Sequence, residues 1–209
     1  RMAIIQNGSS LFTGDAGSGA SEIRRYVIEG DLVEAIIQLP IDLFYNTGIS
    51  TYIWVLTKGK DLQRSGKVQL IDASKCFVKR RKNIGSKRVD LDDSCIDLII
   101  RAYEAFGNET YQENDLVVES KVFDNRFFGF TKVTVETAQT DASGKPILKR
   151  GKKQPVKGAS DTEIIPLGQD MDAYMAKNVL PYNPLAYIDP TKSKIGYEVP
   201  FTRLFYKYV

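Results

Sequence analysis

The sequence predicts an α/β fold for the first part of the chain, followed by an α-rich C-terminal region with a small β element. Three observations lead to this prediction. Short apolar runs in the first third alternate with a helical pattern, as in sheets whose strands are connected by helices. The runs are almost continuously apolar, which is typical of strands covered on both faces. Beyond residue 72 this organisation changes.

The first third contains four expected strands and one helix. Residues 2–6 form a short apolar run that ends at an Asn-Gly turn signal,. A loop rich in Gly and Ser follows at residues 8–21, and a helical pattern at residues 23–28 ends at Gly30,. The later strands are expected at residues 32–39, 51–56 and 68–71,. Because the chain opens abruptly on a strand of the central type, we expect that a preceding segment has been lost.

The next region begins with a basic loop at residues 76–88. Residues 90–106 are expected to form a helix, and Asp92 or Asp93 is placed to cap its start,. The apolar positions of this helix form one stripe, which consists of Ile96, Ile99, Ile100, Tyr103 and Phe106.

Further along, we expect strand or hairpin structure at residues 127–135, an exposed loop at residues 137–160 and a last helix at residues 169–179,. The tail at residues 180–209 is dense in Pro and Tyr and is expected to pack irregularly. These changes divide the chain into a sheet-forming part, a part with basic loop, helix and β element, an exposed basic linker or loop, and a C-terminal helix with its tail. Their bounds are 1–75, 76–136, 137–160 and 161–209.

The composition is that of an ordinary soluble globular protein, with 43% hydrophobic and 26% charged residues among 209,. No apolar run approaches the roughly 20 residues that a membrane-spanning helix needs, and we expect no signal peptide at the start of the chain. We therefore expect a cytoplasmic protein without a membrane partner. With Cys76 and Cys95 but no histidine, we expect no metal site and no Ser-His-Asp or Cys-His catalysis,. Both cysteines are expected to pack in the core.

The loop Gly14–Gly19 lies between a strand and a helix, where phosphate-binding loops are found,. It lacks the Lys-Ser/Thr ending of a P-loop and the spacing of the dinucleotide fingerprint. The interpretation we favour is a flexible connection in which Ser18 or Ser21 caps the following helix.

A basic run at residues 79–88 carries six positive charges and no acid. Such a run favours contact with the phosphate backbone of nucleic acid, although a solvated surface loop has the same composition. The candidate residues are Lys79, Arg80, Arg81, Lys82, Lys87 and Arg88. A second cluster at residues 145–157 also has six cations, and it is a weaker candidate for contact with nucleic acid because its composition is typical of disorder,.

The turn at residues 43–49 places two aromatic residues, Phe44 and Tyr45, between two strands and beside small polar residues. An exposed aromatic side chain in such a loop can stack on an extruded base. The alternative is that it fills the core beneath the loop.

Segments along nearly the whole chain carry a family resemblance. They are NGSSLFTGDAGSG at residues 7–19, IIQLP at 36–40, LFYNTGI at 43–49, TYIWVL at 51–56, GKVQLIDA at 66–73, RKNIGSKR at 81–88, FGF at 128–130, LPYNP at 180–184 and GYEVPFTR at 196–203. In this order they resemble the modification subunits of type I restriction–modification systems. These subunits are N6-adenine DNA methyltransferases.

The resemblance implies transfer of a methyl group from S-adenosylmethionine to adenine N6 in double-stranded DNA. It also implies a Rossmann-like sheet with one reversed strand near its edge, of which this chain would supply the C-terminal part. Residues 32–39 and 51–56 would be the antiparallel closing pair of that sheet. Phe44 then becomes a candidate for stacking on the flipped base, Tyr45 a weaker one, and the pocket wall would be shaped by Asn46, Thr47 and Gly48.

Two motifs of the family are absent from this sequence. One is the glycine-rich loop that holds the donor, and the other is the Asn/Asp-Pro-Pro-aromatic motif, since the chain contains no Pro-Pro pair. The latter is needed because its acceptors hold the adenine amino group in line with the methyl group. We therefore expect no catalytic or cofactor-binding residue in this chain, and no methyl transfer or S-adenosylmethionine binding by the chain alone.

The partners that the resemblance implies are a specificity subunit that reads the DNA sequence, a second modification subunit and a restriction subunit. The Tyr- and Pro-rich tail is a candidate docking surface, with packing inside the subunit as its alternative. Two other functions stay open. One is a non-catalytic nucleic-acid-binding module that uses the basic run at residues 79–88, and the other is a piece whose role is subunit assembly.

Overall fold

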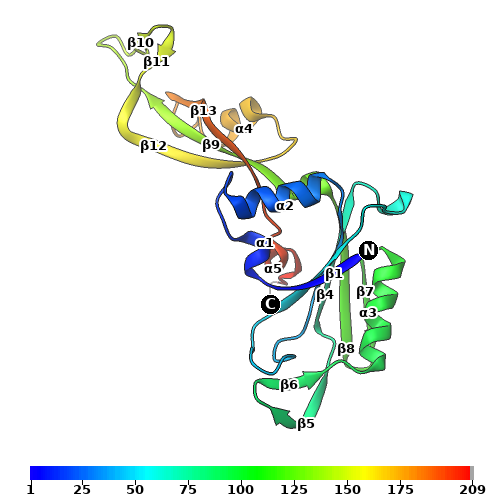
Figure 1. Ribbon diagram of the computed structural model, residues 1–209. Helices are drawn as coiled ribbons and strands as arrows, with labels where there is room; N and C mark the ends of the chain where they lie inside the picture. Colours follow the sequence, from blue (N-terminus) through cyan, green and yellow to red (C-terminus); the bar gives the residue numbers. More distant parts are fainter. Residues whose placement is uncertain (208–209) are drawn as a thin grey trace.

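The computed structural model describes residues 1–207 and shows an elongated molecule with a sheet at each end (Figure 1). The larger sheet has six strands and the smaller has three. Helix α2 (Gly19–Glu29) lies where the two sheets meet. Among the described residues, no helix is long and apolar enough to cross a membrane.

The larger sheet is mixed. Its strand order is β1 (Met2–Asn7), β3 (Thr51–Leu56), β2 (Val33–Gln38), β4 (Lys67–Lys75), β8 (Leu116–Asp124) and β7 (Glu109–Glu113). Strands β2 and β4 run parallel, and the other neighbouring pairs are antiparallel. The expected antiparallel pair at residues 32–39 and 51–56 is confirmed, with Ile37 opposite Ile53.

Burial differs sharply between the middle and the edge of this sheet. Most residues of β2 and β4 are buried, as expected of strands that are covered on both faces,. All six residues of the edge strand β1 are exposed, among them the apolar side chains of Met2, Ile4 and Ile5. The strand expected at residues 2–6 is thus present, but it is an edge strand and not one of the central type, and the described chain does not cover it.

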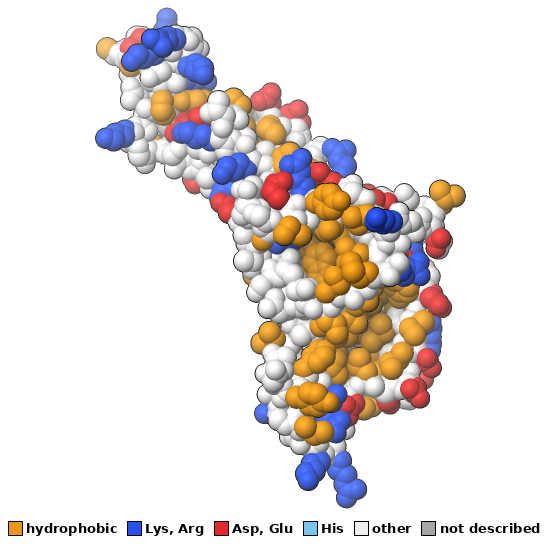
Figure 2. All heavy atoms as spheres, viewed as in Figure 1, with side chains coloured by type: hydrophobic (Ala, Val, Ile, Leu, Met, Phe, Trp, Pro, Cys, Tyr) orange, Lys and Arg blue, Asp and Glu red, His pale blue; other side chains and the backbone are white. Residues whose placement is uncertain are grey.

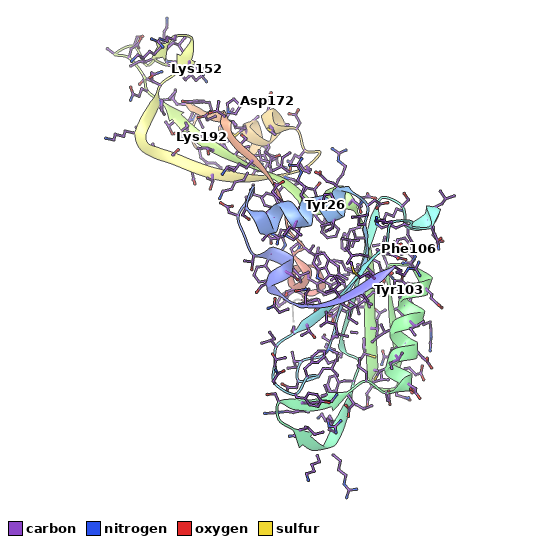
Figure 3. All side chains as sticks on the ribbon, in the orientation of Figure 1. Tyr26, Tyr103, Phe106, Lys152, Asp172 and Lys192 are labelled. Atoms are coloured by element: carbon purple, nitrogen blue, oxygen red, sulfur yellow. The ribbon has the colours of Figure 1, made fainter. Side chains whose placement is uncertain are left out.

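A buried charge inside β2 is matched by partners from two other elements. Arg64, in the 3-10 helix η1 (Leu62–Arg64), lies with its Nε 3.7 Å from Glu34 Oε1. The Tyr103 hydroxyl donates to the same oxygen at 2.7 Å. The Arg64 guanidinium also sits 4.4 Å from the ring centroids of Tyr103 and Phe106 (Figure 3). Since a buried charge is costly unless paired, this network fixes β2 against the helix that carries Tyr103.

That helix, α3 (Asp93–Ala105), matches the sequence expectation closely. Asp92 is its N-cap, because Asp92 Oδ1 accepts a hydrogen bond from Cys95 N at 2.9 Å,. The expected apolar stripe was correct only in part, because Ile99 and Tyr103 pack against the core whereas Ile96 and Ile100 are exposed. The side chains that α3 buries are Cys95, Leu98 and Ala102. The expected stripe and the buried face of α3 are offset by one residue position. Because both consist largely of apolar residues, the sequence pattern did not show which one faces the core.

The expected core packing of both cysteines is confirmed. Cys76 and Cys95 are free thiols with no exposed surface, and the sulfur of Cys76 lies 3.6 Å from the carbonyl oxygen of Cys95. Burial raises the pKa of the Cys76 thiol to about 12. The thiol therefore stays protonated at neutral pH and is a poor nucleophile.

The smaller sheet is antiparallel, with β9 (Gly129–Ala138) between β12 (Pro155–Pro166) and β13 (Ala186–Tyr197). Helix α4 (Met171–Asn178) packs on it and confirms the helix expected at residues 169–179. The core between them is formed by Val133, Val135, Ile165, Met175, Val179 and Ala186. The short helices α1 (Ser9–Phe12) and η2 (Asn125–Phe128) precede α2 and β9.

The α/β prediction is confirmed, but the C-terminal region is richer in strand than the α-rich region we expected. The basic loop at residues 76–88 is a hairpin of β5 (Val78–Ile84) and β6 (Lys87–Asp90). The loop at residues 137–160 contains a further hairpin, β10 (Leu148–Lys149) and β11 (Lys152–Lys153), and the start of β12. These strands are polar and gain their conformation from pairing across the sheet, which local apolar patterns do not report.

The tail returns to the larger sheet and contributes to its core. Helix α5 (Phe201–Phe205) places Phe201 5.2 Å from Tyr52, measured between ring centroids in an edge-on contact. Tyr197 and Val199 are buried in the same cluster, whereas Tyr182 is 87% exposed. Packing inside the subunit therefore accounts for part of the described tail. Its role in docking and the four-part division of the chain stay predictions.

Candidate nucleic-acid interface

The turn between β2 and β3 contains all five residues expected to line a target-base pocket. Phe44 and Thr47 form an isolated β-bridge across the turn. Phe44 is half-buried, whereas Tyr45 is 66% exposed and Asn46 is also exposed. A side chain at Gly48 would place its Cβ 2.8 Å from Asp42 Oδ1. The turn is therefore tight, and of its two aromatic side chains only that of Tyr45 is mostly exposed.

The β5–β6 hairpin packs directly against this turn. Ser86 N donates to the Tyr45 carbonyl oxygen at 2.7 Å, and Arg88 N donates to the Asp42 carbonyl oxygen at 2.8 Å. Gly85 has a φ of +59°, and a Cβ there would lie 2.5 Å from the Tyr45 carbonyl oxygen. The structure thus joins the candidate base-pocket residues and the candidate DNA-backbone residues into one surface. The sequence did not predict this contact, because the two segments lie about 40 residues apart,.

Half of the six cations on the hairpin are paired with carboxylates. Asp90 contacts the guanidinium of Arg80 and lies 2.9 Å from Lys87 Nζ. Its hydrogen bond with Lys87, and then that with Arg80, lowers the pKa of the Asp90 carboxyl group. Arg88 Nε lies 3.9 Å from Asp42 Oδ2.

The other three hairpin cations are exposed. They are Lys79, Arg81 and Lys82, and within the described residues no carboxylate oxygen lies within 4.0 Å of their charged nitrogens. The sequence analysis treated all six cations alike and missed the carboxylates. Asp90, two residues beyond the run, was the available signal for two of these pairs.

The glycine-rich loop has a structural role in this chain. Ser18 caps α2, since Ser21 N donates to Ser18 Oγ at 3.4 Å. Asp15 Oδ2 lies 2.7 Å from Lys132 Nζ on β9, and this hydrogen bond lowers the pKa of Asp15. The loop therefore links the first helices to the smaller sheet, in agreement with the connection we favoured over a phosphate-binding loop.

An apolar groove of about 390 Å³ runs between β1, β3 and α2, and its walls include Ile4, Ile23, Val27, Trp54 and Leu56. Figure 2 shows a broad apolar area where these elements lie. None of the groove's lining residues is a carboxylate, the group that usually binds ribose hydroxyls in nucleoside sites. The lining of this groove therefore does not fit S-adenosylmethionine. The described residues contain no cluster of three His, Cys, Asp or Glu side chains able to hold a metal ion.

Comparison with known proteins gives the family. Residues 1–142 match the model of the N-6 DNA methylase family. The chain belongs to this family. Among curated relatives, the type I restriction enzyme MjaIX methylase subunit of Methanocaldococcus jannaschii is 31% identical over 148 residues, which are 70% of this chain and 23% of that protein. The HindI methylase subunit of Haemophilus influenzae is 44% identical over 71 residues, 34% of this chain and 15% of that protein.

A solved structure is also similar to this N-6 DNA methylase chain. It is the methyltransferase subunit of a type I restriction-modification system from Streptococcus thermophilus, with 26% sequence identity and a TM-score of 0.47. The similarity covers 59% of this chain and 23% of that one. The matched part of this chain thus covers less than a quarter of the length of each of these relatives.

Proposed function

We propose that this chain forms the target-base side of a type I restriction–modification methyltransferase that methylates adenine N6 in DNA. The observation that carries the proposal is the contact between Tyr45 and Ser86, which holds an aromatic turn and a basic hairpin on one surface. An enzyme that modifies a base inside a duplex needs both features, since it must hold the backbone while the base is rotated out of the stack.

In this proposal the exposed cations Lys79, Arg81 and Lys82 bind phosphate groups beside the target base. Their contacts position the DNA without reading its sequence. Phe44 stacks on the extruded adenine, with Asn46, Thr47 and Gly48 as the wall of the pocket and Tyr45 as the second aromatic candidate. Aromatic stacking supplies about 1–3 kcal/mol per base, enough to offset part of the cost of unstacking.

The methyl donor and the catalytic acceptors come from outside this chain in our proposal. S-adenosylmethionine is the donor that the family uses, and the groove beside β1 lacks the carboxylate that commonly binds a ribose,. We propose that the remaining part of the methyltransferase domain covers the open edge of β1 and the apolar groove beside it. Exposed apolar strand edges are normally paired or covered, and the exposure of Ile4 and Ile5 supports this placement.

The names of the relatives support a multi-subunit assembly on DNA. We propose as partners a specificity subunit, a second modification subunit and, in the full complex, a restriction subunit. Tyr182 in the described tail is exposed and belongs to the candidate docking surface. Location in the cytoplasm stays a prediction.

The stacking role is tested in the native protein that contains this chain, assembled with its specificity subunit. Phe44→Ala and Phe44→Leu are compared on DNA that carries the fluorescent base 2-aminopurine at the methylated position. We expect both variants to lose about 10- to 100-fold in kcat/KM, from lost stacking of about 1–3 kcal/mol, and to leave the flipped base brighter because the quenching ring is absent.

Leucine keeps an apolar side chain beneath the turn, so full activity of Phe44→Leu would mean that Phe44 only packs there. The same loss in Tyr45→Ala instead would transfer the role to Tyr45. If the native protein binds DNA but does not methylate it, the chain is a non-catalytic DNA-binding module. If it does neither yet still assembles with its partners, its role is assembly.

A further inference from the structure

A second basic element lies at the far end of the molecule from the β5–β6 hairpin. We call residues 142–157 the arm tip. It extends from the smaller sheet beyond β9 and β12, and Lys152 marks its outer part in Figure 3. It contains six cations and no acid, and these are Lys145, Lys149, Arg150, Lys152, Lys153 and Lys157.

The arm tip has a defined backbone, where the composition suggested disorder. Ile147 N donates to the Gln139 carbonyl oxygen at 2.8 Å, and Gln154 N donates to the Ile147 carbonyl oxygen at 3.0 Å. The Tyr187 hydroxyl of β13 donates to the Lys153 carbonyl oxygen at 3.2 Å. Just before the tip, Asp141 Oδ1 accepts from Ser143 N and Lys145 N and so closes a loop. The cations are therefore presented on a hairpin that is attached to the sheet.

The charges of the arm tip are not neutralised within the described chain. All six side chains are exposed, and among residues 1–207 none of their charged nitrogens lies within 4.0 Å of a carboxylate oxygen. Lys153 Nζ lies over an aromatic ring instead, 5.2 Å from the centroid of Tyr187. Figure 2 shows the resulting cluster of basic side chains at one end of the molecule.

This concentration of charge is opposite in sign to the rest of the chain. The whole chain has 29 Lys and Arg and 26 Asp and Glu. Without the six arm-tip cations, 23 cations and 26 acids remain, which is a net charge of −3. The arm tip therefore supplies more than the whole net positive charge of the chain.

The turn of the tip is built around a residue poorly suited to it. Arg150 has a φ of +52° and Gly151 a φ of +76°, so both central residues of the two-residue turn are left-handed. Asn is the residue that such a turn prefers in its first position, because it tolerates this conformation better than long side chains do. Arg150 thus carries a conformational cost that brings a guanidinium to the outermost point of the hairpin.

We propose that the arm tip binds the phosphate backbone of the DNA duplex, at a point away from the base that the Phe44 turn engages. This inference rests on the proposed function, because it takes DNA as the substrate. Unpaired cations on a projecting hairpin match a continuous line of phosphates, and their binding releases counterions. A two-stranded ribbon also has the width to enter the major groove. An acidic protein partner would need carboxylates placed to match these cations. A DNA duplex is favoured because it presents negative charge along its whole length.

The test uses the native protein with its specificity subunit and two triple variants of equal charge. One is Lys149→Gln/Arg150→Gln/Lys152→Gln in the arm tip, and the other is Lys79→Gln/Arg81→Gln/Lys82→Gln in the β5–β6 hairpin. The Kd for DNA is measured from about 50 to 200 mM salt, and each lost phosphate contact reduces the salt slope by about 0.9. Two duplexes are used, one ending just past the methylation site and one extending far beyond it.

On the long duplex, the arm-tip variant is expected to bind about 10- to 100-fold more weakly, with a slope smaller by up to about 2.7. On the short duplex it should bind like the unmodified protein, while the hairpin variant should be weaker on both. An unchanged Kd and slope on the long duplex would overturn the inference. So would a loss of subunit assembly without a change in DNA binding.

Arg150→Asn separates charge from structure. Because Asn suits the left-handed position, a purely structural role predicts equal or higher thermal stability and unchanged DNA binding. The DNA-binding role predicts equal or higher stability together with a salt slope smaller by about 0.9. If the native protein neither methylates nor binds DNA, the proposed function itself fails. If the native protein methylates and binds DNA, and no arm-tip substitution changes its DNA binding, only this inference fails.

Discussion

The β5–β6 hairpin and the arm tip each carry six Lys or Arg residues, and they lie at opposite ends of the molecule (Figure 1). Their surroundings differ. On the β5–β6 hairpin, Asp90 and Asp42 pair with three of the cations, and the backbone is fixed against the Phe44 turn. On the arm tip, no described carboxylate pairs with any of the six, and the contacts to the sheet are few.

The difference shows that the number of cations in a basic run does not determine how many of them can bind phosphate. Carboxylates that fold next to the run decide how many cations stay available, because a close opposite charge competes with the ligand. The sequence suggested that residues 79–88 were the stronger candidate. The arm tip has more cations available to phosphate than the β5–β6 hairpin has. The β5–β6 hairpin, however, is the one that adjoins the turn between β2 and β3, which contains the candidate pocket residues.

The largest expected effect is on the contact that fixes the β5–β6 hairpin. Gly85→Ala would force a Cβ to within 2.5 Å of the Tyr45 carbonyl oxygen at a φ of +59°. We expect a loss of about 2–4 kcal/mol in the free energy of unfolding, since steric overlap adds to the left-handed penalty. Methylation should fall with it, because the turn and the hairpin separate. Denaturant unfolding and a methylation assay measure the two effects.

The matched control lies on the arm tip. Gly151 has a φ of +76°, but a Cβ there meets nothing within 4 Å. Gly151→Ala should therefore cost only the conformational penalty of about 1–2 kcal/mol and leave methylation of a short duplex unchanged. Equal losses from both substitutions would show that the contact with Tyr45 has no importance.

An intermediate effect is expected from Asp90→Asn, which should make the β5–β6 hairpin more like the arm tip. Arg80 and Lys87 lose their carboxylate and become available to phosphate. DNA binding should strengthen at neutral pH, with a salt slope steeper by up to about 1.8. An unchanged slope would mean that these two side chains do not reach the DNA.

The same variant gives a pH dependence with a definite sign. The pKa of Asp90 is lowered in the folded protein, from an ordinary value of 3.8, by hydrogen bonds from Lys87 and Arg80. Its ion pairs therefore stabilise the fold above pH 3.8, and this contribution is lost as the pH falls through the lower folded-state pKa,. The difference in thermal midpoint between the unmodified protein and Asp90→Asn should disappear in that range. A difference that persists there would contradict the assignment.

The smallest effect compares two lysines on one hairpin. Lys82 has no described carboxylate partner, whereas Lys87 Nζ lies 2.9 Å from Asp90. Lys82→Gln should reduce the salt slope of DNA binding by about 0.9. Lys87→Gln should change the slope much less, because its charge is already used. Salt titration of both variants tests this difference. Equal changes in slope would show that the ion pair with Asp90 does not reduce the contribution of Lys87 to DNA binding.

Several features followed from the sequence by itself, because local patterns encode them. The apolar run of β2 reflects burial on both faces, and Asp92 provides the cap of α3 at a fixed spacing. The lack of a Pro-Pro pair led us to predict that the catalytic acceptors lie outside this chain, and this stays a prediction. The ordered motifs along the chain indicated the family to which the match at residues 1–142 assigns it.

Other features were decided only by the tertiary structure. Strand β13 contains Pro190 and a polar stretch and exists because β9 pairs with it, across a register shift between Asp189 and Lys194. The arm tip is likewise ordered by pairing with distant segments, since its backbone is hydrogen-bonded to Gln139 and Tyr187. The contact of Ser86 with Tyr45 and the pairing of Arg88 with Asp42 join segments about 40 residues apart,. No local pattern reports such partners, because their energy arises only when the folded chain brings them together.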